Sequence, residues 1–120
     1  MRYSLLALVF ALAPLALLST GCQEPISCTL ELRPSISLEV VDAETGEDVD
    51  AMVTFQIDGG ATQESGHTGA QHSLGEEEDG TFVVTVSADG YEPVMSEYVV
   101  TQDECHVMTV EATVELVPSA

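Results

Sequence analysis

The chain has 120 residues, and 21 acidic residues against two basic ones give it a formal charge of −19 at pH 7. After residue 21 the imbalance is greater still, because all 21 acidic residues and only one basic residue, Arg33, lie there, which leaves −20. A partner that presents phosphates needs cations to neutralise them, so the composition excludes nucleic acid and argues against electrostatic attachment to anionic lipid headgroups.

The N-terminal segment has the layout of a secretion signal that is removed after export. Arg2 precedes an apolar run over residues 3–18, and the small residues 19–21 come directly before Cys22. The run is shorter than the roughly 20 apolar residues that span a bilayer, and Pro14 interrupts it. We therefore expect a cleaved signal peptide over residues 1–21.

The end of this segment, residues 15–22, resembles the lipobox of bacterial lipoproteins, in which the cysteine receives a diacylglycerol and becomes the new N-terminus. The resemblance implies that Cys22 is lipidated and that residues 22–27 form a short linker at the membrane of the cell envelope. Gln23, where an aspartate would favour retention, implies the outer membrane in a Gram-negative host. Lipoboxes usually carry Leu where Ser19 stands; the alternative is an ordinary signal that leaves Cys22 as a free thiol.

If Cys22 carries lipid, Cys28 and Cys105 remain as a pair in an oxidising compartment. The pair predicts a disulfide that closes a long loop, for which the chain-entropy model gives about 4.5 kcal/mol. A zinc site with Cys105 and His106 is the alternative, but no C-x-x-C spacing supports it.

The first half of the remaining chain alternates apolar and polar residues, as half-buried strands do. Strands are expected over residues 29–32, 35–42 and 51–57, with a turn at 43–46 and a stop at 58–60. The side chains expected to face inward are Ile36, Leu38 and Val40 in one strand and Ala51, Val53, Phe55 and Ile57 in the next.

Residues 61–80 are rich in Gly, Ser, Thr and Glu and are expected to form a functional or mobile loop with one short strand at 71–74. It contains His67 and His72, read as exposed loop residues with a weak spacing for metal binding. The charge run at 76–79 is expected to be a solvated tip.

The second half resumes the alternation and predicts strands over residues 81–88, 97–101 and 106–117. Tyr91, after a turn at 89–90, is expected to pack its ring and to bond its hydroxyl to the backbone. No helical period occurs after the signal. We therefore predict an all-β, Greek-key β-sandwich of about seven strands over residues 28–120.

Two stretches of the sequence match a known pattern of turns and strands: residues 36–42 (ISLEVVD), 45–46 (TG) and 51–53 (AMV), then 79–86 (DGTFVVTV) and 88–91 (ADGY). Together they resemble the signatures of carboxypeptidase regulatory-like domains. The resemblance implies a transthyretin-like Greek-key sandwich without carboxypeptidase activity, because in that family this module accompanies a separate catalytic domain.

No catalytic arrangement stands out. Ser65 and Ser73 could pair with the histidines, but no Gly-x-Ser-x-Gly elbow is present, so we expect no enzyme activity. A calcium site at one end of the sandwich is the single cofactor to consider, with a hydrated acidic rim as the alternative. The carboxylates that would form it are Asp42, Glu44, Glu47, Asp48 and Asp50.

The sequence thus predicts a non-catalytic, lipid-anchored module of the cell envelope with a structural or protein-interaction role. It touches the membrane through Cys22 and would meet an envelope protein or a glycan. The alternatives are a lipoprotein that binds Ca²⁺, carbohydrate or protein through residues 61–80 and, more distantly, a hydrolase.

Overall fold

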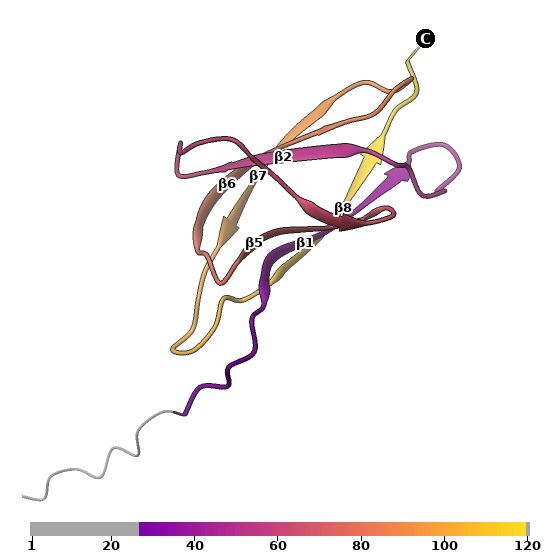
Figure 1. The fold of residues 1–120 in the computed structure, drawn as a ribbon. Helices are drawn as coiled ribbons and strands as arrows, with labels where there is room; N and C mark the ends of the chain where they lie inside the picture. The colour runs from indigo at the N-terminus through magenta and orange to yellow at the C-terminus, as the bar shows by residue number, and fades with distance from the viewer. Residues whose placement is uncertain (1–26, 120) are drawn as a thin grey trace, which may run out of the picture.

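A computed structural model describes residues 27–119 and shows two stacked four-stranded β-sheets (Figure 1). One sheet has the strand order β4-β5-β1-β8 and the other the order β3-β2-β6-β7. No helix in the described region has the length and apolar character needed to cross a membrane. The strands are β1 (Pro34–Asp42), β2 (Met52–Ile57), β3 (Gln63–Glu64), β4 (Gly66–Thr68), β5 (Gln71–Glu76), β6 (Gly80–Ser87), β7 (Val94–Val100) and β8 (Val110–Leu116).

Strand β1 lies inside its sheet, antiparallel to β5 and parallel to β8. The chain changes sheets at the connections β1–β2, β3–β4, β5–β6 and β7–β8, so strands from both halves of the sequence form each layer. The two ends of the sandwich consequently differ: the chain enters β1 beside the β7–β8 connection and leaves β8 at the opposite end (Figure 1).

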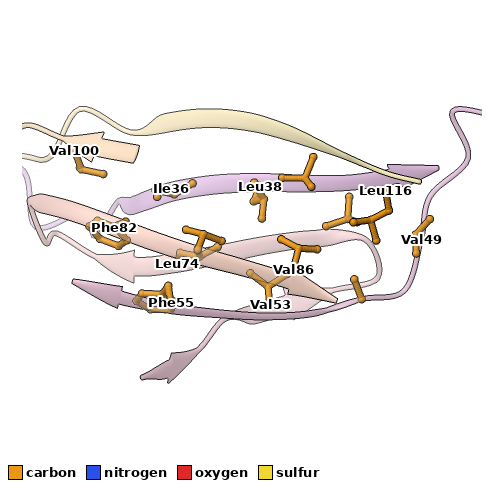
Figure 2. Packing of buried hydrophobic residues seen from close by; sticks show 14 of the residues in the cluster. Ile36, Leu38, Val49, Val53, Phe55, Leu74, Phe82, Val86, Val100 and Leu116 are labelled. Atoms are coloured by element: carbon orange, nitrogen blue, oxygen red, sulfur yellow. The ribbon is translucent and has the colours of Figure 1, made fainter. Parts of the chain in front are cut away.

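Apolar side chains from both sheets fill the space between them (Figure 2). Phe55 and Phe82 stack with ring centroids 5.6 Å apart, and Ile36, Leu38 and Leu74 meet them from the opposite layer. Strict alternation fixes the register, because a one-residue slip would turn these side chains outward. The all-β sandwich predicted from the sequence is therefore confirmed, with eight strands where about seven were expected.

The expected strand over residues 29–32 is wrong. Leu30 is 99% exposed, Leu32 is also exposed, and strand β1 begins at Pro34. Proline has no N–H for a ladder, but at the first residue of a strand this N–H is not needed. The last strand is also shorter than expected, because Met108 lies outside β8 and is exposed.

The expected long loop over residues 61–80 is wrong as well. This segment contains β3, β4 and β5, and it crosses from one sheet to the other between β3 and β4. The strand expected at 71–74 exists and extends to Glu76. The short strands β3 and β4 could not be predicted from periodicity, because two or three residues are too few to show an alternation.

The alternation of inward and outward side chains along β6 gives the first testable prediction. Phe82→Ala should lower the free energy of unfolding by about 3–5 kcal/mol, because it leaves a cavity in the core. Val83→Ala, on the outer face of the same strand, should change it by only about 0.5 kcal/mol. Denaturant titration measures both, and equal losses would show that β6 does not face the core as described.

Candidate functional site

Two histidines lie side by side, one on β4 and one on β5. His67 is directly opposite His72 in the antiparallel pair, and their ring centroids are 5.3 Å apart with an angle of 31° between the planes. His67 is exposed on the edge strand, as expected from the sequence. His72 is not, because only 2% of it is accessible and it lies on β5 rather than in a loop. Its reading as an exposed loop residue was wrong.

Ser65 holds the buried imidazole from the connection between the two sheets. Its hydroxyl lies 2.7 Å from His72 Nδ1, while its backbone N–H donates to the carbonyl of Val53. The other ring nitrogen, His72 Nε2, is buried and has no hydrogen-bond partner among the described residues. Burial and the nearby His67 both lower the pKa of His72, and the carboxylate of Asp50 acts in the opposite direction.

This serine–histidine pair does not reproduce a nucleophilic triad. A triad needs an acid that hydrogen-bonds the second ring nitrogen of the base, and within residues 27–119 His72 Nε2 has no such partner. Ser73, the other serine considered, lies on β5 opposite Gly66 and Ser37. The contact with Ser65 holds the ring of His72 in place.

A cleft of about 620 Å³ opens beside the histidine pair. Three short segments line it: residues 50–53 at the start of β2, residues 64, 65 and 67 in the β3–β4 region, and residues 87–89 at the end of β6. This volume falls in the range of small-molecule sites, about 300–1,000 Å³. Its polar lining comes from Asp50, Glu64, Ser65, His67, Ser87 and Asp89.

At one end of the sandwich a disulfide ties the entering chain to the β7–β8 connection. Cys28 and Cys105 are bonded, with Cα atoms 5.2 Å apart and a sequence separation of 77. Asp103 shapes the same connection, because its carboxylate accepts the backbone N–H groups of Cys105 and His106, which lower its pKa. The predicted bridge is therefore present, while Cys22 and the signal lie outside the described residues.

Glu77 joins the same end of the molecule, contrary to the expected solvated tip. Its carboxylate lies 2.6 Å from His106 Nδ1 and accepts the backbone N–H groups of Arg33 and Val107. The residue adopts a left-handed conformation (φ 52°), which is uncommon outside glycine. Desolvation raises the pKa of Glu77, but the bonds from His106 and the two N–H groups prevail and lower it.

His106 has a partner at each ring nitrogen. Nδ1 faces Glu77, and Nε2 lies 2.9 Å from the hydroxyl of Thr29 in the entering chain. His106 therefore has both ring nitrogens satisfied, although it lies in the β7–β8 connection and not in the strand expected over residues 106–117, and Cys105 is in the disulfide rather than beside it on a metal. No sequence pattern links Glu77 to His106, because the two are 29 positions apart.

The structure does not gather the five calcium candidates. Asp42 is buried, and its carboxylate already accepts the N–H groups of Glu44 and Thr45 and the hydroxyl of Tyr91. The side chains of Glu44, Glu47, Asp48 and Asp50 are exposed. Across residues 27–119, no three His, Cys, Asp or Glu side chains stand together in a way that would hold a metal ion.

Tyr91 bonds to a side chain rather than to the backbone as expected. Its hydroxyl donates to Asp42 Oδ2 over 2.7 Å, which lowers the pKa of Asp42 and raises that of Tyr91. The contact joins the turn after β1 to the turn after β6. No pattern in the sequence connects these residues, because they are 49 positions apart.

Comparison with known proteins gives one family. A model described as a domain of unknown function, DUF3869, matches residues 34–116, which covers all eight strands. The chain belongs to the DUF3869 family. No curated protein matches the sequence. The histidine pair and Glu77 lie inside the matched part of the DUF3869 domain, whereas Cys28 and Thr29 precede it.

The disulfide gives a second prediction. Replacing both Cys28 and Cys105 with Ser should lower the free energy of unfolding by about 2–4 kcal/mol, because the unfolded chain loses a 77-residue crosslink. Chemical denaturation measures this, and reduction of the native protein serves as the matched control. An unchanged denaturation midpoint in both samples would contradict the stabilising role.

Glu77 gives a third prediction, on pH. Its pKa is lowered in the folded protein, so its contribution to stability is present above the ordinary value of 4.5 and is lost as pH falls through the folded value. Glu77→Gln keeps the size and an acceptor but removes the charge. The variant should be less stable at pH 7 and should lose less stability than the native protein on acidification below pH 4.5. Parallel acid dependences of the two melting temperatures would refute this.

Proposed function

We propose that this DUF3869 domain is a non-catalytic, lipid-anchored β-sandwich of the cell envelope that binds a protein partner through one face. The observation that carries the proposal is the unequal charge of the two outer sheet surfaces. On strands β2, β6 and β7 the outward side chains form a face with Glu97 as its single charged member. We call it the neutral face: Met52, Thr54, Gln56, Thr81, Val83, Thr85, Ser87, Met95, Glu97 and Val99.

The opposite surface is acidic. On β1 and β8 the outward positions include Glu39, Glu111 and Glu115, which the parallel register brings onto adjacent strands. In a chain with 21 carboxylates, a sheet surface whose charged members are Glu97 and, on the edge strand β3, Glu64 repels a non-cationic partner less than the acidic surface does. The exposed Met95 and Val99, 72% and 63% accessible, add apolar area for a protein contact.

The anchor end supports the same proposal. Lipidation at Cys22 would leave only a few residues before Cys28, and the disulfide fixes Cys28 to the end of the sandwich. Five residues reach at most about 18 Å, so the domain would stand close to the lipid surface. A bound partner would consequently be held at the membrane.

The resemblance to carboxypeptidase regulatory-like domains remains a proposal with local support. One signature falls on β1, its turn and β2, and the other on β6 and the turn before Tyr91. Both form central parts of the sandwich, as such a module would require. A non-catalytic role agrees with a serine–histidine pair that has no acid partner.

A second candidate function is ligand binding beside the 61–80 segment, favoured by the 620 Å³ cleft that Glu64, Ser65 and His67 help to line. Its carboxylates Asp50 and Asp89 suit a cation or a neutral polyhydroxy ligand rather than an anion. This function would use the narrow side of the sandwich, where the cleft adjoins the neutral face at Met52 and Ser87.

The neutral face gives the fourth prediction. Met95→Glu adds a carboxylate there, and Thr113→Glu adds one to the acidic surface as the matched control. In producing cells treated with a chemical crosslinker, the native protein and Thr113→Glu should give the same crosslinked species. Met95→Glu should reduce it several-fold, because the partner would meet a charge. Equal yields from the two variants would place the contact elsewhere and overturn the proposal.

A further inference from the structure

His67 on β4 and His72 on β5 lie directly opposite each other, and their arrangement is suited to binding a shared ligand. Directly paired residues of antiparallel strands share a face, with Cβ atoms about 4.5–5.5 Å apart. His67 and His72 are such a pair, with ring centroids 5.3 Å apart. Two imidazoles on one tetrahedral ion, each with a metal–nitrogen distance of about 2.0–2.1 Å, would have ring centres about 5 Å apart. The observed spacing therefore suits one shared ion.

The buried ring already has the support that a metal-binding histidine needs. When Nδ1 of His72 carries the proton, it donates to Ser65 Oγ over 2.7 Å, and Nε2 presents a lone pair. Metal-binding histidines are usually held in this way, with the second ring nitrogen donating to an oxygen. In this structure Nε2 is the one buried side-chain nitrogen or oxygen without a partner among the described residues. A metal ion would satisfy it.

The two imidazoles would be the protein ligands of the ion. No third His, Cys, Asp or Glu of the described residues stands with them, so water would complete the coordination. Asp50 lines the same cleft as His67 and adds negative charge that favours a cation there. Imidazole nitrogens suit zinc or copper rather than calcium.

We propose that His67 and His72 bind a divalent transition-metal ion, with water completing the coordination and Ser65 as a positioning residue. The site lies beside the cleft and does not involve the neutral face. The proposal therefore stands independently of the proposed protein contact. Ions that prefer oxygen ligands, such as Ca²⁺, should not compete for it.

The histidines allow a direct test, because the chain has only three. The untagged mature protein is titrated with Zn²⁺ in an excess of Ca²⁺, which occupies surface carboxylates, while NMR follows the three imidazole signals. The signals of His67 and His72 should move together, and that of His106, which has partners at both ring nitrogens, should not. Movement of none, or of all three alike, would overturn the proposal.

Variants measured by calorimetry add a second readout. His67→Ala, an exposed change on an edge strand, should weaken Zn²⁺ binding at least 10-fold, and Ser65→Ala should weaken it about 10-fold through the second-shell contact. Thr68→Ala, the exposed neighbour on β4, is the matched control and should bind as the native protein does. If His67→Ala retains native affinity, the carboxylates alone bind the ion and the proposal is wrong.

Discussion

The shortage of lysine and arginine determines which interactions hold this structure together. Arg33 is the only lysine or arginine after residue 21, so apart from its contact with Glu31 the carboxylates there cannot be paired with these cations. Those that the fold uses are bound instead by N–H and O–H donors: Asp42 by a turn and a tyrosine, Asp103 by the turn beside the disulfide, and Glu77 by two N–H groups and an imidazole. Hydrogen bonds to an ionised acceptor are the stronger kind, so Asp42 and Glu77 hold distant segments together, while Asp103 holds a local turn.

The same constraint separates the molecule into regions with different roles. Other carboxylates lie in solvated turns and on the outer surface of β1 and β8, whereas the outer surface of β2, β6 and β7 has Glu97 alone, with Glu64 beside it on β3. At the end where the chain enters, the disulfide and the contacts of Glu77 and His106 fix the residues that follow the proposed anchor. The histidine pair lies elsewhere, beside the cleft on β4 and β5.

Much of the fold could be predicted because it depends on local alternation. The inward faces of β1, β2 and β6 follow from a period of two, and the pairing of Cys28 with Cys105 follows from cysteine number and compartment. The strands β3 and β4 could not be predicted, since they are too short to show a period. The expected strand at 29–32 failed because two leucines in alternation do not ensure a neighbouring strand to pair with.

The candidate site was less predictable, because it depends on contacts between distant residues. His72 was assigned to a loop, and its burial became visible only once β5 was placed between β4 and β1. Glu77 was hidden in a run of four acidic residues, and its role follows from the approach of the β7–β8 connection. Sequence patterns indicate which residues face inward, but they do not indicate which polar groups meet there.

We propose that the disulfide-bonded sandwich is held at a lipid surface through Cys22. The intact mass of the native protein, extracted from membranes and measured before and after reduction, tests it most directly. We expect a chain that begins at Cys22, carries the mass of acyl groups, and gains two hydrogen atoms on reduction. An unacylated chain whose mass is unchanged by reduction would contradict it.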